Sequence, residues 1–572
     1  MFSISLFVEL LRTRPLALFW AMAFLQVALW TAVPLLFYSA PPGELPLVLA
    51  VGHEFQFGTE FGPPLAFWLA EIVYRAAGMA GVYLLSQVCV VTTFWAVLRL
   101  GRAIVGDSHA VMAVLLMAGI AVFSAPTAEF GPAILAAPLW ALLLLHAWLG
   151  ARHGDWRYWA AAGLEAGLLV LTTYAGLILV GLVVAYLLAS RSGRAQLESV
   201  GPWLAGLVAV SVLFPYLTWL DLSGGARLIG LSMLVDNVRS WGWLALAVIA
   251  SHAGMGILMV LGRSPATGSE RAPEILRPPL DPAARTFVYL FALLPVVAMG
   301  LFALFSRRPE NFIAVPLVVM SGLAVIVAAG DRIRIGYQYA IGYVWLALIV
   351  LPPLLIALAI VIQPWIAAAD LQVARPAKEL GRFFGDSFVR RTARTLEIVA
   401  GDRSLASLIA LTAPGRPSLV FEAAPGYPER ITLQDMFNKG AVIVWLATDT
   451  TGRPPPEIAR RFPGLVPEVP QTFERRFQGR TPLLRVGWAM IRPGTMPAPP
   501  AAPVEAPAPV LPPQPLPRLP DTPVFVPPEQ APPPPPVQVQ PPPAPRAPVP
   551  ARPTPSSPPQ QFDPTYDRHR PQ

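Results

Sequence analysis

The residues best suited to chemistry in this sequence are carboxylates that stand in short loops between long apolar runs. A carboxylate held near an apolar surface carries a desolvation cost, which makes it a functional candidate. Eight of them fall on the same side of the predicted helices: Glu44, Glu54, Glu60, Glu71, Glu129, Asp221, Asp236 and Glu310. We expect any chemistry on this side of the protein.

Two of these carboxylates directly precede apolar segments. Glu44 lies in APPGELPL at the head of a long loop, and Glu129 lies in SAPTAEFGP. Either could be functional, but a carboxylate at a helix N-terminus is also favoured by the helix dipole. The residues alone leave both explanations open.

His53 and Glu54 are neighbours that could bind a metal ion together. A lone His-Glu pair without a second His at helical spacing is a weak metal signal, and a hydrogen bond within the loop is the favoured explanation. The single cysteine, Cys89, excludes an intramolecular disulfide. We therefore predict no required metal and no cofactor.

The composition shows which elements must position these residues. Of 572 residues, 55% are hydrophobic and 13% charged, whereas soluble domains carry about 25% charged residues. About eleven apolar segments are candidates to cross a membrane. They lie at about 15–38, 82–100, 110–125, 132–150, 158–172, 174–190, 202–220, 241–262, 286–305, 313–329 and 339–362.

The distribution of arginines predicts the orientation of these segments. Alternate loops hold 14 arginines on one side and 5 on the other, and the arginine-rich side is cytoplasmic. The N-terminus then lies inside, and an odd number of crossings places the chain beyond about residue 363 in the periplasm. Because the arginines stand singly or in pairs between apolar runs, the net charge of +8 does not indicate nucleic-acid binding.

Three regions follow from these patterns. Residues 1–365 form the membrane domain, in which residues 65–74 are an amphipathic stretch suited to the membrane surface. Residues 366–495 form a small periplasmic α/β domain, with buried strands in TLEIVAG and AVIVWLA. Residues 496–572 are a disordered, proline-rich tail.

Several stretches then carry a resemblance to a known family. The first outward loop contains Glu44, the pair His53-Glu54, Pro63-Pro64-Leu65 and Trp68. Residues 139–179 follow, and then RTLEIVAGDRSLASLIALTAPGRPSLV, GAVIVW and PLLRVGWAMIRPG. In this order they resemble the polyprenol-phosphate-dependent GT-C glycosyltransferases of the ArnT-like and protein O-mannosyltransferase-like branch (glycosyltransferase family 39, RgtA/B/C/D-like). That family usually has Asp where this chain has Glu44.

The resemblance implies a mostly α, GT-C type helix bundle in the inner membrane. It implies transfer of a sugar from an undecaprenyl-phosphate carrier to a lipid, glycan or protein acceptor at the periplasmic face. Glu44 would be the general base, with Glu54 as second choice, and Glu129 would orient the acceptor or complete the acidic cluster. The carrier phosphate would be bound by Arg307, Arg308, Arg227 and Arg239. For Arg307 and Arg308, anchoring at the lipid headgroups is an equal alternative.

Two other functions stay open. A lipid or solute transporter or flippase would show internal repeats and ionisable residues at mid-membrane depth, but the sequence shows no repeat, and Glu165 is the main charge within a predicted span. A catalytically inactive relative acting as a scaffold is the other alternative.

Overall fold

The computed structural model describes residues 5–59, 61–124, 128–222, 234–263, 274–305, 315–335, 338–366, 370–420, 431–447, 452–480 and 482–494. The predicted proline-rich tail, residues 496–572, lies outside these ranges.

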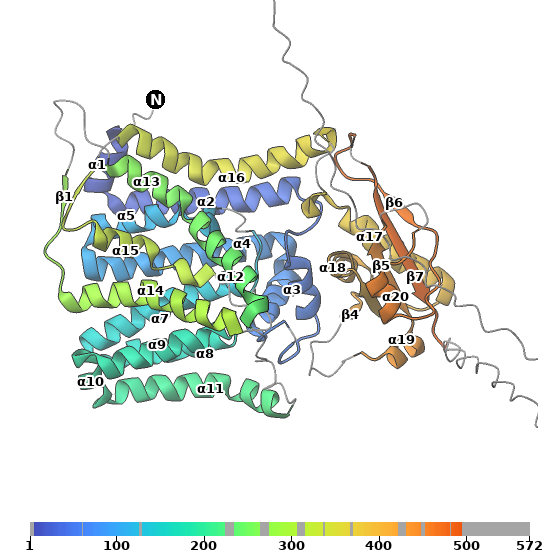
Figure 1. Ribbon diagram of the computed structural model, residues 1–572, viewed down its shortest axis with the longest axis horizontal. Helices are drawn as coiled ribbons and strands as arrows, with labels where there is room; N and C mark the ends of the chain where they lie inside the picture. The colour runs from blue at the N-terminus through green and yellow to red at the C-terminus, as the bar shows by residue number, and fades with distance from the viewer. Residues whose placement is uncertain are drawn as a thin grey trace, which may run out of the picture. The chain divides into compact units, whose positions relative to one another are not determined.

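The N-terminal part consists mainly of helices that run beside one another (Figure 1). Its α-helices are α1 (Ser5–Thr13), α2 (Pro15–Phe37), α3 (Leu45–Gly52), α4 (Leu65–Val105), α5 (Asp107–Met117), α6 (Ala121–Ser124), α7 (Pro132–His153), α8 (Trp156–Val170), α9 (Ala175–Ala189), α10 (Arg191–Leu197), α11 (Val200–Leu222), α12 (Leu234–Ser251), α13 (Ala253–Arg263), α14 (Pro282–Phe305), α15 (Ser321–Ala328) and α16 (Gln338–Ile366). A two-stranded sheet pairs β1 (Glu274–Leu276) with β2 (Arg332–Arg334).

These helices make the chain a multi-pass membrane protein. Each of the eleven predicted apolar segments contains a helix. Within the described ranges, six helices are long and apolar enough to cross a membrane, or up to eight spans if each of two bent helix pairs counts as one. The number eleven and the orientation of the helices stay predictions.

The ends of α7 and α8 show how the sequence sets these helices. Pro132 begins α7, where its missing N–H costs no hydrogen bond. Gly154 ends α7 in the left-handed conformation, with φ +69°, and the Asp155 side chain then accepts a hydrogen bond from the Arg157 N–H to cap α8. A tight turn between two antiparallel helices results.

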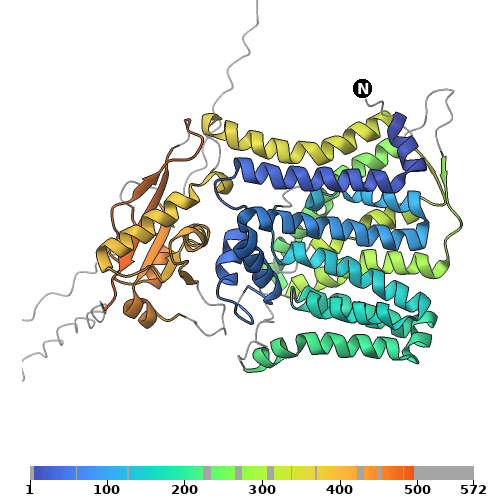
Figure 2. The ribbon, with the colours of Figure 1, turned by 180° about the vertical axis from the view of Figure 1, so that it is seen from behind.

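Small residues let these helices pack closely. A Cβ on Gly163 of α8 would lie 2.3 Å from the Ala205 carbonyl oxygen of α11, and one on Gly150 of α7 would lie 2.8 Å from Cε2 of the Trp159 ring. Helices far apart in sequence also pack together, since α16 contacts α2, and the two run side by side in both views (Figures 1 and 2).

The carboxylate that the sequence places inside a span has a partner within the bundle. Glu165 of α8 is buried, and its two oxygens lie 2.7 and 2.9 Å from Nδ1 of His146 on α7. His146 and Glu165 are therefore each other's polar partners inside the bundle.

Helix α4 is interrupted where the sequence predicts two separate elements. Gly78 has φ +61° and ψ −156°, which breaks the helical path between residues 65–77 and the apolar remainder. The predicted amphipathic stretch 65–74 lies in the first of these two pieces. Its position on a membrane surface stays a prediction.

The chain from residue 377 to 491 forms a mixed five-stranded sheet with helices. Its helices are α17 (Ala377–Thr392), α18 (Arg403–Thr412), α19 (Leu433–Lys439) and α20 (Pro456–Arg461). Its strands are β3 (Ile398–Gly401), β4 (Ser418–Val420), β5 (Ala441–Leu446), β6 (Gln471–Phe473) and β7 (Leu484–Ile491), in the order β4-β3-β5-β7-β6. Both stretches predicted as strands contain one, β3 and β5.

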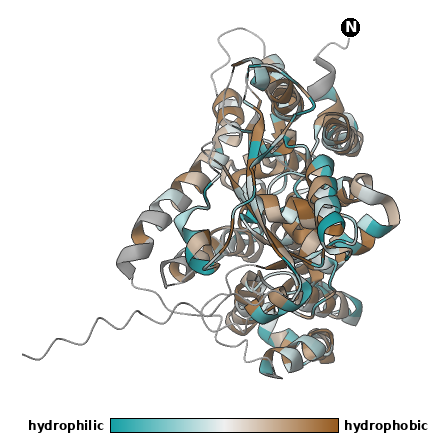
Figure 3. Cartoon of the chain, turned by 90° about the vertical axis from the view of Figure 1, so that its right-hand side faces the viewer, coloured by the Kyte–Doolittle hydropathy of each residue, from teal (hydrophilic) through white to brown (hydrophobic). Residues whose placement is uncertain are grey.

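The central strand β5 explains why AVIVWL is apolar throughout. It pairs parallel with β3 and antiparallel with β7. Val442 and Val444 face one core, which includes Phe384 and Phe388 of α17, while Ile443 and Trp445 face another. Hydrophobic residues, brown in Figure 3, accordingly run along the strands, because both faces of the sheet are covered.

The loop after α2 is fastened to the segment that leads into this sheet. The N–H groups of Ser39 and Ala40 donate to the Val373 carbonyl at 2.8 and 3.1 Å, and Gln372 Nε2 donates to the Gly43 carbonyl at 2.6 Å. Helix α3 packs against both α4 and α18. The loop that carries Glu44 is therefore held from two parts of the chain.

Candidate active site

Glu44 stands at the first turn of α3 with its side chain directed outward. It occupies the N-cap position but makes no capping hydrogen bond with its side chain. Instead, its Oε1 lies 2.9 Å from Nη2 of Arg403, at the start of α18, and 65% of the Glu44 side chain is exposed. The carboxylate is therefore open to a ligand.

Glu129, just before α7, lies next to Glu44. The Glu44 N–H donates to Oε1 of Glu129 at 2.7 Å. The approach is close at the preceding residue too, because a Cβ on Gly43 would lie 1.9 Å from the Glu129 carboxyl carbon. The two predicted carboxylates are thus brought together by a backbone contact that only glycine at position 43 permits.

The surroundings of Glu129 favour its protonated form. Burial raises the pKa of Glu129, and the charge of Glu44 adds to this, although the hydrogen bond from the Glu44 N–H opposes it. Burial, and then the charge of Glu129, raise the pKa of Tyr38 to about 12. Tyr38 therefore stays a neutral phenol near Glu129.

Glu54 is not part of this pair. It follows the other end of α3, whose eight residues separate the two positions by about 12 Å along the helix axis. Its Oε2 accepts a hydrogen bond from Gln56 Nε2. Of the predicted carboxylates, the structure joins Glu44 with Glu129 and leaves Glu54 apart.

The remaining predicted first-loop residues shape the chain between α3 and α4. Pro63 and Pro64 are buried, and Pro64 caps the start of α4. Trp68 Nε1 donates to the Gln56 carbonyl at 2.8 Å, and its ring meets Phe57 edge to face with centroids 5.4 Å apart. These contacts hold the loop closed on itself.

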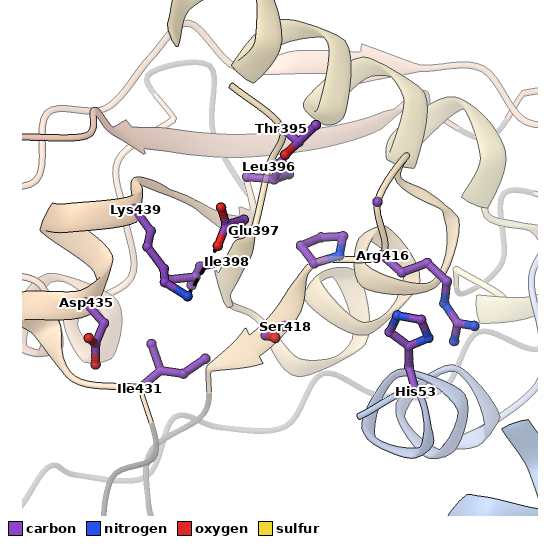
Figure 4. Close-up of a pocket in the computed structure, with 12 residues that line it drawn as sticks. His53, Thr395, Leu396, Glu397, Ile398, Arg416, Ser418, Ile431, Asp435 and Lys439 are labelled. Carbon is purple, nitrogen blue, oxygen red and sulfur yellow. Dashed lines mark ion pairs between the residues drawn. The ribbon is translucent and has the colours of Figure 1, made fainter. Parts of the chain in front are cut away.

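His53 takes part in a cluster that the sequence did not identify. Its Nδ1 lies 3.1 Å from Oε1 of Glu71, whose side chain is fully buried. Glu71 also accepts from Arg75 Nε at 2.7 Å and from Arg416 Nη1 at 2.8 Å. Figure 4 shows the His53 ring beside the Arg416 guanidinium. The loop hydrogen bond expected for His53 is thus made to Glu71.

Part of this cluster has a local signal. Glu71 and Arg75 stand at i and i+4, a spacing that favours ion pairs on a helix. Arg416, the distant partner of Glu71, and Arg403, the partner of Glu44, have no such signal, because both come from the chain beyond residue 400.

The arginines predicted to bind the carrier phosphate cannot be placed. Arg227, Arg307 and Arg308 lie outside the described residues, as does Glu60 of the acidic set. Arg239 lies in α12, but its side chain is outside the description. Their role stays a prediction.

The chain is similar to a known protein family in sequence and to known structures in fold. Residues 62–219 match the model of a family described as dolichyl-phosphate-mannose-protein mannosyltransferase. The fold is similar to that of ArnT from Cupriavidus metallidurans in the apo state, with a TM-score of 0.53 and 13% identity over 83% of this chain and 97% of that one. The chain has a GT-C glycosyltransferase fold. The resemblance predicted from the sequence is confirmed.

Two further solved structures align with lower TM-scores. ArnT from C. metallidurans bound to undecaprenyl phosphate aligns with a TM-score of 0.49 and 13% identity, over 83% of this chain and 98% of that one. The apo oligosaccharyltransferase of Archaeoglobus fulgidus aligns with a TM-score of 0.38 and 14% identity, over 71% of this chain and 64% of that one. No curated protein matches this GT-C chain.

Proposed function

We propose that this protein is a membrane glycosyltransferase that moves a sugar from a polyprenyl-phosphate carrier to an acceptor hydroxyl at the periplasmic face of the inner membrane. One observation carries the proposal. Two loops bring Glu44 and Glu129 together at the start of α3, where the Glu44 N–H donates a 2.7 Å hydrogen bond to the Glu129 carboxylate and the Glu44 carboxylate stays exposed. In a chain with this fold, an open carboxylate held at a loop fits a general base.

The transfer needs one proton acceptor and one stabilised leaving group. Glu44 takes the proton from the acceptor hydroxyl while the oxygen of that hydroxyl forms a bond to the anomeric carbon of the sugar. The bond from that carbon to the phosphate oxygen breaks, and the electron pair leaves with the polyprenyl phosphate. Glu129 fixes the backbone of the base and so its position.

Cations must balance the charge on the leaving phosphate. We assign this role to Arg307, Arg308, Arg227 and Arg239, which the arginine distribution puts on the outward side. ArnT from C. metallidurans is known bound to undecaprenyl phosphate, and this supports undecaprenyl phosphate as carrier here. The inner membrane is the location that such a donor implies, with the α/β part in the periplasm.

The acceptor is lipid A or its core, another glycan, or a protein. The transporter alternative has less support, because the carboxylate within a predicted span, Glu165, is paired with His146. An inactive relative would keep the fold but lose transfer.

Transfer of radiolabelled sugar from cell-derived donor lipids to membrane extracts tests the proposal. Glu44→Gln should lower transfer by at least about 100-fold, and Glu457→Gln, which changes an exposed carboxylate on α20, serves as matched control. If Glu54→Gln loses transfer and Glu44→Gln does not, the general base is Glu54, at the other end of α3. Full activity in both glutamate variants, or no transfer by the unaltered protein, would refute the mechanism.

A further inference from the structure

A polar cavity lies where the end of α3 meets the sheet. It has a volume of about 420 Å³, within the range of about 300–1,000 Å³ that small-molecule sites occupy. Figure 4 shows its lining: His53 from the end of α3, residues 395–398 at the start of β3, residues 415–418 at the start of β4, and Asp435 with Lys439 on α19.

The charges that line the cavity cancel. Arg416 and Lys439 are balanced by Glu397 and Asp435. Arg416 is engaged with Glu71, and Asp435 accepts from both the N–H and the hydroxyl of Thr432 in a capping box. The remaining pair, Lys439 Nζ and Glu397 Oε2, lies 3.3 Å apart with both side chains more than half exposed.

This remaining pair can exchange its contact for a ligand. An exposed ion pair contributes little to stability, so its ammonium group can donate to a ligand and its carboxylate can accept from one without a large loss. The hydroxyls of Thr395 and Ser418 add groups that both donate and accept. Donors and acceptors therefore stand side by side without a surplus of either charge.

Such a lining matches a neutral polyhydroxy ligand. Each sugar hydroxyl donates one hydrogen bond and accepts others, so it can use an ammonium and a carboxylate together. A phosphate group would instead face Glu397 and Asp435, and like charges brought together oppose binding.

We propose that this cavity binds a neutral saccharide unit of the acceptor. The proposal rests on the transferase function proposed above and names the acceptor class. His53 ends α3 and Glu44 begins it, so the cavity and the proposed base are separated by about 12 Å along that helix. An acceptor of more than one sugar unit places one unit in the cavity and offers the hydroxyl of another to Glu44.

Binding to the purified full-length protein tests this without any transfer step. Calorimetric titration would use the neutral trisaccharides maltotriose, cellotriose, mannotriose and chitotriose, with glucose 6-phosphate and inorganic phosphate as anionic probes. At least one trisaccharide should bind. Ser418→Phe, which fills the cavity, and Lys439→Met should each weaken that binding about tenfold or more, because hydrogen bonds to the ligand are lost.

Thr472→Phe on the exposed side of β6 is the matched control and should bind as the unaltered protein does. Each variant must keep the unaltered protein's melting temperature to count, and Lys439→Met covers the case in which Ser418→Phe does not fold. No binding of any trisaccharide, unchanged binding in a folded cavity variant, or binding of the anionic probes alone would overturn the proposal.

The same titration separates this proposal from the proposed chemistry. Glu44→Gln should keep saccharide binding, since Glu44 does not line the cavity. Binding retained while Glu44→Gln transfers sugar normally would refute the assigned base and leave the cavity's role intact. If Glu44→Gln loses transfer but neither the unaltered protein nor any variant binds a saccharide, the cavity's role is refuted and Glu44 stays the assigned base.

Discussion

Arg416 Nη1 lies 2.8 and 2.9 Å from the two carboxylate oxygens of Glu71, a residue 345 positions earlier in the chain. Its Nη2 donates to the Leu49 carbonyl of α3 at 2.9 Å, and its guanidinium lies 5.1 Å from the Tyr74 ring centroid. One side chain from the loop before β4 therefore contacts both α3 and α4. Together with Arg403 at the other end of α3, it holds the helix that carries Glu44.

Removing Arg416 should destabilise the protein strongly. Arg416→Met leaves the fully buried Glu71 carboxylate without the cation that contacts both of its oxygens, and removing one partner of a buried ion pair costs about 3 kcal/mol. Chemical denaturation of the purified protein measures the loss. Arg416→Lys should recover only part of it, because one ammonium lacks the planar pair of nitrogens with which Arg416 contacts Glu71 and the Leu49 carbonyl together.

Arg102→Met is the matched control for this measurement. Arg102 and Asp107 also form an ion pair at 2.7 Å, but 34% of the Arg102 side chain and 50% of the Asp107 side chain are exposed, so the loss should be about 0–1 kcal/mol. Equal effects of the two substitutions would contradict the importance given to the Glu71 cluster.

Arg403→Gln should impair transfer more than stability. The Glu44–Arg403 pair is half exposed or more on both sides, so its loss costs about 0–1 kcal/mol of folding free energy. Without Arg403 the base is less well oriented, and a displacement of about 1 Å can lower a rate by about 100-fold. We expect kcat to fall with little change in melting temperature, and Arg403→Lys to restore part of the rate. A lower melting temperature with unchanged kcat would show that the pair is only structural.

The sequence predicted those features that are encoded locally. Uninterrupted apolar runs predicted the long helices of the N-terminal part. The strands β3 and β5 could be predicted because both of their faces are buried, which makes their sequences apolar throughout. Glu44 and Glu129 were found because carboxylates next to apolar runs are rare.

What the sequence left out are contacts between distant residues. The tie of Glu71 to Arg416 and of Glu44 to Arg403 depends on how the sheet packs against α3, and no spacing in the chain expresses that. The residues alone also could not show which of Glu44 and Glu54 lies next to Glu129, because this depends on the direction in which α3 runs.

The raised pKa of Glu129 predicts how stability depends on pH. The folded protein keeps this proton at pH values at which the unfolded chain, with an ordinary carboxyl pKa near 4.5, has lost it. The contribution is fully present below that value and is lost as the pH rises through the raised pKa of the folded state. The melting temperature should therefore fall across this window in the unaltered protein. Glu129→Gln, which cannot ionise, should remove that part of the slope, and an identical slope in both proteins would contradict the assignment.

Trp68 should order the chain between α3 and α4. Trp68→Phe keeps an aromatic ring against Phe57 but loses the hydrogen bond to the Gln56 carbonyl, at a cost of about 1 kcal/mol. Trp68→Ala removes both and should cost about 3 kcal/mol. Limited proteolysis should then cut residues 53–64 faster in the order Ala, Phe, Trp at position 68. Equal cleavage rates in all three proteins would show that other contacts hold this loop.

Gly43→Ala should disable the site through Glu129. Gly43 has φ +52°, and a methyl group there would lie 1.9 Å from the carboxyl carbon of Glu129, so the Glu129 side chain must move and the hydrogen bond to the Glu44 N–H is lost. The left-handed backbone alone costs a side chain about 1–2 kcal/mol. Gly464→Ala isolates that cost, because Gly464 has φ +80° with nothing within 4 Å of the added methyl group. We expect both variants to lose similar stability from strain, while only Gly43→Ala loses transfer by about 100-fold. Equal transfer rates in the two variants would show that the contact between Glu44 and Glu129 does not position the base.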